Sequence, residues 1–116
     1  MDTATARKRL EEMRDDLDRS ILVLRGERPA DEGAPGYHAD PADAGANLSE
    51  ADRIEAILEA AQAQRAQVIE ALDRLAAGSY GTCIDCGKPV PEGRLDARPE
   101  AARCVACQAK ADRLRR

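Results

Sequence analysis

The chain has 116 residues, which is enough for one compact domain, but its side chains argue against a large hydrophobic core. It contains no Phe and no Trp, and much of its apolar fraction is Ala, so a metal ion, disulfides or helix pairing must add to the stability. A formal net charge of −4 disfavours a phosphate-binding surface as the main activity.

The first predicted helix covers about residues 3–25. Its apolar residues recur at spacings of three and four, as on one face of an amphipathic helix, and they are Leu10, Met13, Leu17, Ile21 and Leu24. Gly26 follows at a C-cap position, and the next twenty residues have the composition of a loop. The N-terminus lacks the apolar stretch that would predict a signal peptide or a membrane span. We therefore expect a cytoplasmic protein.

A second helix is predicted from near Ser49, where Ser49-Glu50-Ala51-Asp52 has the form of a capping box, to Gly78. Arg65 interrupts its apolar face. At about 1.5 Å per residue, this helix is an arm of roughly 40 Å. We expect the two helices to pair antiparallel, with about residues 26–48 as the connecting tip. A coiled-coil hairpin with no role beyond structure is the alternative interpretation of the apolar faces alone.

Four cysteines form two Cys-x2-Cys pairs with 17 residues between them, and they are Cys83, Cys86, Cys104 and Cys107. This spacing is typical of a closed zinc site in which four thiolates surround the metal. Gly81 and Gly87 flank the first pair and relieve backbone crowding there. We therefore predict one structural Zn²⁺ as the cofactor, with no open position for a substrate.

Two other readings of the cysteines remain. No βαβ pattern surrounds either pair, which weakens a thioredoxin-like dithiol, and a reducing compartment weakens two disulfides. A zinc site that releases its metal on oxidation is a further alternative. Composition after Cys104 predicts a short basic helix, so the expected domains are a coiled-coil hairpin over residues 1–79 and a zinc finger over 80–116.

Residues 80–89, the Arg-Leu-Asp-Ala-Arg-Pro run at 94–99 and the second cysteine pair together resemble the DksA/TraR family of zinc-finger transcription regulators. The resemblance covers roughly residues 40–108. It implies a mainly α-helical fold, with an antiparallel coiled-coil hairpin mounted on a small four-cysteine zinc finger. It also implies that RNA polymerase is the partner and that the tip enters the secondary channel to change initiation.

The resemblance also implies roles for particular residues. The family's tip motif maps onto residues 40–45, so Asp40 and Asp43 would approach the polymerase active site, although Gly45 stands where the family has Ala. Arg98 is a candidate contact for polymerase or nucleotide. Gln67 and Gln108 occupy places where members that cooperate with guanosine tetraphosphate carry cations, so we expect weak or absent synergy with that nucleotide.

Without the resemblance, Asp40 and Asp43 read as solvated loop acids, and the lone His38 as a solvated loop residue. Nothing in the sequence forms a catalytic set, so we predict that the protein is not an enzyme. A zinc protein of the same fold that does not bind polymerase is the second hypothesis. A zinc-ribbon nucleic-acid binder is the third, and the acidity and lack of stacking aromatics count against it, as against sequence-specific DNA binding. We do not expect the protein to bind a membrane.

Overall fold

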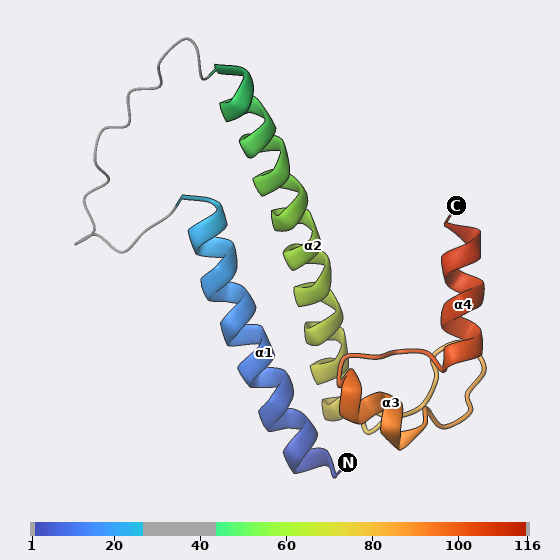
Figure 1. Cartoon of the computed structure of the whole chain (residues 1–116). Helices are drawn as coiled ribbons and strands as arrows, with labels where there is room; N and C mark the ends of the chain where they lie inside the picture. The colour runs from blue at the N-terminus through green and yellow to red at the C-terminus, as the bar shows by residue number, and fades with distance from the viewer. Residues whose placement is uncertain (1, 27–43, 116) are drawn as a thin grey trace.

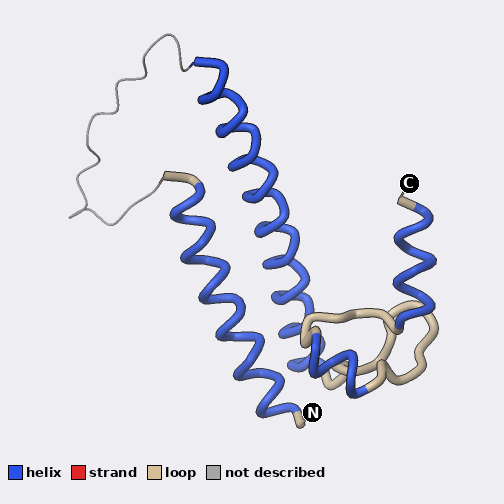
Figure 2. Tube along the Cα trace, viewed as in Figure 1, coloured by secondary structure: helices blue, strands red, loops and turns tan. Residues whose placement is uncertain are grey.

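The computed structural model describes residues 2–26 and 44–115, and the side chains of 2–26 and 49–115. Within these ranges the chain forms four helices, α1 (Thr3–Leu24), α2 (Ala44–Ala77), α3 (Glu92–Ala97) and α4 (Val105–Leu114). Helices α1 and α2 run antiparallel, and the short helices α3 and α4 lie in a small module at their base (Figure 1). Loops join the elements of that module (Figure 2). The mainly helical fold is as predicted.

Helix α1 has about the predicted limits, and capping contacts hold both of its ends. The Asp2 carboxylate accepts a hydrogen bond from the Thr5 N–H at 2.7 Å, which satisfies a free donor of the first turn. At the other end the Arg25 N–H donates to the Ile21 carbonyl, and Gly26 follows with φ 76°. Glycine adopts this left-handed conformation without strain.

Helix α2 is longer than predicted at its N-terminal end. It begins at Ala44 and not near Ser49, so the predicted 26–48 loop is too long and Ser49 lies inside the helix. Its C-terminal end agrees with the prediction. Gly78 has φ 80°, and its N–H and that of Ser79 donate to the carbonyls of Leu75 and Arg74. These two bonds form a Schellman cap.

The hairpin core lies near the base and consists of the buried residues Ala6, Leu10, Val68, Ala71 and Leu75. Met13, Leu17 and Leu72 pack against it. Two of its members are alanines with no exposed surface, one from each helix, so small side chains separate the two backbones there. The antiparallel pairing predicted from the apolar faces is therefore present.

Arg65, which interrupts the apolar face of α2, forms an ion pair across the hairpin. Its Nε donates to Oδ1 of Asp18 on α1, and both side chains are about half exposed. A charge pair at one position of an otherwise apolar seam favours one register of two helices over others. The interruption is thus a cross-helix contact.

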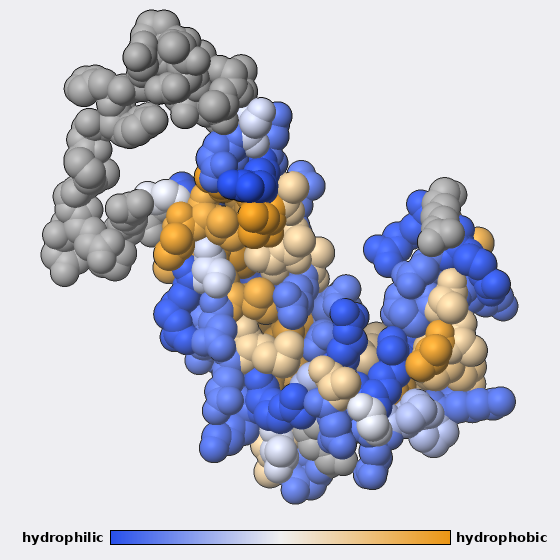
Figure 3. All heavy atoms as spheres, viewed as in Figure 1, coloured by the Kyte–Doolittle hydropathy of each residue, from blue (hydrophilic) through white to orange (hydrophobic). Residues whose placement is uncertain are grey.

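The molecule is elongated, with principal extents of 56 × 37 × 20 Å. Apolar surface lies along the hairpin, most visibly on its half away from the zinc-finger module (Figure 3). The predicted tip acids Asp40 and Asp43 and the loop residue His38 lie outside the described residues. No helix in the described part of the chain is long and apolar enough to cross a membrane.

Candidate metal centre and the adjacent cleft

The first cysteine pair lies in a tight backbone loop after α2. The Cys83 N–H donates to the Lys88 carbonyl at 2.8 Å, and the Gly87 N–H donates back to the Cys83 carbonyl at 3.0 Å. Gly87 has φ 75° and Gly81 has φ 88°, so glycine fits both positions. A bridge between Thr82 and Pro89 closes the loop. Cys83 and Cys86 thus leave the same turn.

The second pair is held by the start of α4. Cys104 is the N-cap residue of that helix, and Cys107 lies in its first turn. The Gln108 N–H donates to the Cys104 carbonyl at 2.9 Å. The Ile84 N–H donates to the Ala102 carbonyl at 3.0 Å, which joins the two pairs through the backbone.

The four sulfur atoms converge. All four Sγ atoms lie within 4.8 Å of one another, and Cys86 Sγ is 3.9 Å from Cys104 Sγ. Four bonds of about 2.3 Å in a tetrahedron require sulfurs about 3.8 Å apart. A disulfide needs about 2.05 Å, and the four cysteines are free. The cluster therefore fits a tetrahedral zinc ion, and no disulfide links its cysteines.

The surroundings of the sulfurs differ within the cluster. The backbone N–H groups of Cys86 and Cys104 point at the Cys83 sulfur and lower the pKa of that thiol to about 6. The neighbouring thiols of Cys104 and Cys83 raise the pKa of Cys107 to about 12. Hydrogen bonds among the crowded sulfurs thus favour the protonated thiol at Cys107, and repulsion from the charge of Cys104 adds to this effect.

Side chains also clamp the two pairs together. Arg103 Nε donates to Asp85 Oδ2 at 2.7 Å, and Arg94 Nε donates to the Arg103 carbonyl at 2.9 Å. These contacts were not predicted from the sequence. A signal was present, because Asp85 lies inside the first pair and Arg103 directly precedes the second.

Tyr80 connects the zinc-finger module to the hairpin. It packs against the hairpin core and against a second cluster formed by Cys83, Val90 and Leu95. Its hydroxyl donates to the Pro99 carbonyl at 2.8 Å, and burial raises the pKa of the phenol. One side chain thus contributes to both cores.

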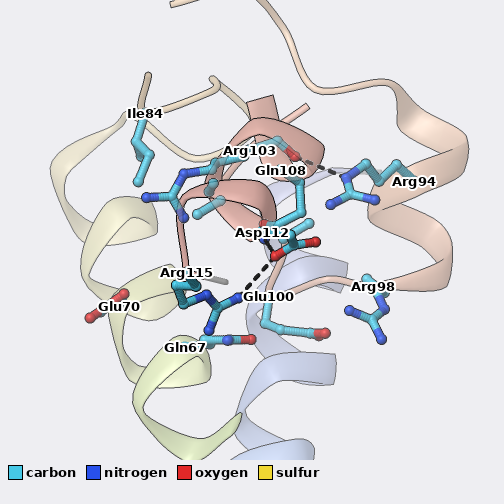
Figure 4. Close-up of a pocket in the computed structure, with 13 residues that line it drawn as sticks. Gln67, Glu70, Ile84, Arg94, Arg98, Glu100, Arg103, Gln108, Asp112 and Arg115 are labelled. Atoms are coloured by element: carbon cyan, nitrogen blue, oxygen red, sulfur yellow. Dashed lines mark hydrogen bonds and ion pairs between the residues drawn. The ribbon is translucent and has the colours of Figure 1, made fainter. Parts of the chain in front are cut away.

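A cleft of about 520 Å³ lies between α2 and α4, and we call it the α2–α4 cleft. Gln67, Arg98 and Gln108, which the sequence places far apart, all line it (Figure 4). Glu100 lines it as well, and this buried residue was not anticipated. The structure thus brings the three residues of the family comparison to one site.

A long two-helix arm that rises from a four-cysteine cluster defines a class of zinc-finger protein with a coiled-coil arm. Residues 78–113 match the prokaryotic dksA/traR C4-type zinc finger. The chain belongs to the DksA/TraR family.

Relatives in sequence and structure agree with this assignment. The RNA polymerase-binding transcription factor DksA of Caulobacter vibrioides is 39% identical over 82 residues, which cover 68% of this chain and 56% of the relative. The chain thus spans just over half the length of that relative. The structure of transcription factor DksA2 from Pseudomonas aeruginosa has a TM-score of 0.76 and 29% identity, over 98% of this chain and 86% of that one. The DnaK suppressor protein from Agrobacterium tumefaciens C58 has a TM-score of 0.65 and 28% identity, over 95% and 94%.

Proposed function

We propose that the protein regulates bacterial transcription initiation by binding RNA polymerase and inserting its hairpin tip into the secondary channel. The observation that carries the proposal is the arrangement of a narrow arm on a rigid module, in a molecule 56 Å long and 20 Å thin. Such a shape can enter a channel that excludes a globule. A Caulobacter relative named for polymerase binding supports the choice of partner.

In this proposal one zinc ion per chain is held by the four cysteines. All four candidate ligands come from the protein and leave no open position, so the role is structural. The zinc ion would bind thiolates from the turn after α2 and from the start of α4. It would thus hold these two segments together. Residues 80–116 would thus form the module that sets the direction of the arm formed by residues 1–79.

The tip acids Asp40 and Asp43 would act near the polymerase active site. Carboxylates are natural partners of the hard cations found at such sites, so the expected effect is electrostatic. The arm and the module would dock the protein, with Arg98 as a candidate contact. Catalysis is not part of this role.

Co-purification with core RNA polymerase tests the proposal directly. We expect the wild-type chain and the Asp40→Asn, Asp43→Asn double variant to bind equally, and only the wild type to change transcription in vitro. The matched control is Asp52→Asn with Glu59→Gln, which removes two exposed acids from α2. An equal response to the wild type and the tip variant would contradict the acidic-tip mechanism.

Other outcomes of this experiment would indicate a different function for the protein. Absence of any binding to core polymerase would favour a zinc protein of the same fold with a structural role, to which Gly45 and Gln67 also point. A salt-dependent shift of free DNA in a gel would instead indicate a nucleic-acid binder.

A further inference from the structure

Arg98 and Glu100 line the α2–α4 cleft, and neither side chain has an ion pair with the described residues. Glu100 is only 7% exposed, and its Oε2 has no hydrogen-bond partner. A buried carboxyl oxygen without a donor carries a desolvation cost, and a ligand that supplies a donor removes that cost. The Arg98 side chain is exposed and forms no ion pair or side-chain hydrogen bond with the described residues. Both side chains line the cleft (Figure 4).

Other arginines around the cleft are already engaged. Arg94 donates to the Arg103 carbonyl, Arg103 to Asp85, and Arg115 to Asp112. Glu70 also lines the cleft, but its side chain is exposed to solvent, whereas that of Glu100 is buried. The guanidinium of Arg98 and the buried carboxyl of Glu100 are therefore the two groups that we assign to a ligand.

We propose that the α2–α4 cleft binds a free α-amino acid with a short aliphatic side chain. The ligand carboxylate would pair with the Arg98 guanidinium, which can bind it through two parallel hydrogen bonds. Its ammonium group would donate to the carboxyl of Glu100. Rotation of this carboxyl exchanges its two oxygens, so either one can face the ligand.

Size and lining agree with such a ligand. The cleft volume of about 520 Å³ lies within the range of small-molecule sites. Ala101, Ala102 and Ala111 line it beside the charged groups and offer an apolar surface to a short aliphatic side chain. Gln67 and Gln108 contribute neutral amides from the facing helices.

The cleft is lined by both positive and negative side chains, so it favours a zwitterionic ligand over a ligand with charges of one sign. A polyanion would meet the carboxyls of Glu70 and Glu100, and a diamine would meet the guanidinium of Arg98 and those of the engaged arginines. A molecule with one positive and one negative group avoids both conflicts. The proposal does not depend on polymerase binding.

Titration calorimetry of the zinc-loaded full chain tests the site, with L-valine as the probe. We expect saturable binding with a dissociation constant on the order of 1 mM or tighter. N-acetyl-L-valine lacks the ammonium group and L-valine methyl ester lacks the carboxylate, and each should bind at least tenfold more weakly. Absence of saturable valine binding, or equal binding of either analogue, would overturn the proposal.

Variants assign the two contacts. Arg98→Gln and Glu100→Gln should each weaken valine binding at least tenfold. The matched controls Arg113→Gln on α4 and Glu59→Gln on α2 change exposed residues outside the cleft and should leave affinity unchanged. Arg98 is exposed, so its substitution should not disturb folding, and zinc content checks each variant. Unchanged affinity in Arg98→Gln would disprove the assigned geometry.

Discussion

Single residues in the zinc-finger module act on one another at short range. Backbone N–H groups favour a thiolate at Cys83, whereas the crowded sulfurs disfavour one at Cys107. Zinc requires thiolates, so metal binding has to release protons and strengthens as the pH rises. Without a cation, hydrogen bonds among the crowded sulfurs keep the proton on Cys107, and a bound metal ion replaces that proton.

Replacing Cys86 with Ser is expected to release the zinc. The hydroxyl is a poor substitute for the thiolate that lies 3.9 Å from Cys104 Sγ. Metal analysis of freshly reduced protein should give about one equivalent for the wild type and far less for the variant. Ala106→Ser adds a hydroxyl at an exposed position of the second pair and is the control. Full zinc retention in Cys86→Ser would contradict the four-cysteine site.

Tyr80→Phe should destabilise the zinc-loaded protein, because it removes the bond to the Pro99 carbonyl. The expected loss is roughly 0.5–1.5 kcal/mol in the free energy of unfolding. Burial raises the pKa of this phenol above its ordinary value of 10.0, so the hydroxyl contributes fully at lower pH. The contribution disappears as the pH rises through the raised value.

Denaturant unfolding of wild type and Tyr80→Phe at several pH values measures this effect. The difference between the two proteins should be constant below pH 10 and shrink above it. A difference that grows with pH would show that the tyrosinate form is favoured by folding, and that burial is not the dominant influence on Tyr80.

At the scale of elements, the hairpin depends on a small core near its base. Leu10 has no exposed surface, so Leu10→Ala should lower the free energy of unfolding by about 2–5 kcal/mol. Leu22 on the same helix is 46% exposed, and Leu22→Ala should cost much less. Chemical denaturation of both zinc-loaded variants checks this. Equal losses would mean that the core extends evenly along the hairpin.

The Asp18–Arg65 pair should contribute little to stability despite its place in the seam. Both side chains are about half exposed, so a double-mutant cycle with Asp18→Asn and Arg65→Gln should give a coupling of about 0.2–1 kcal/mol. Added salt should reduce it. A coupling that is large and insensitive to salt would place the pair in a desolvated environment.

The limits of the elements show what the sequence can predict. The ends of α1 and the C-terminal end of α2 were predictable because glycine and cap residues mark them locally. The start of α2 was not predictable in this way. The segment before Ser49 contains Ala and Leu, which favour a helix, so the helix continues past the capping box that Ser49 was expected to begin. Helix α3 has six residues, too few to show a helical period, and Gly93 lies within it.

The candidate site divides in the same way. The cysteine cluster was predictable because two short spacings in the sequence impose two turns. The α2–α4 cleft was not, since it depends on how the module sits beside α2, and no local pattern specifies the burial of Glu100. The part played by Tyr80 likewise depends on contacts with two clusters that lie far apart in the chain.

On the scale of the whole molecule, the charges of the cleft bear on nucleotide dependence. We predict that guanosine tetraphosphate adds little to any effect on transcription, because Gln67 and Gln108 are neutral and Glu70 and Glu100 oppose phosphate. A titration with and without nucleotide, using polymerase whose own nucleotide site is disabled, measures the coupling. Synergy of about tenfold or more, about 1.4 kcal/mol, would contradict this.

Gln67→Lys with Gln108→Lys is the matched gain-of-function variant for that titration. Two added cations facing the same cleft should raise the coupling between nucleotide and protein. No gain would mean that the two positions were wrongly assigned from the family comparison, or that this chain docks differently from its relatives.

Because the two long helices differ in length, one part of α2 packs against α1 and the other part extends past it. Helix α2 has 34 residues and α1 has 22, so about a dozen residues of α2, roughly 18 Å, extend past its partner. Near the base α2 contributes Val68, Ala71 and Leu75 to the core, whereas Ile57 is 49% exposed. The free energy needed to open the helix locally therefore falls from base to tip. Within the described residues, the first turns of α2 can therefore open and re-form more readily than the turns that lead into the zinc-finger module.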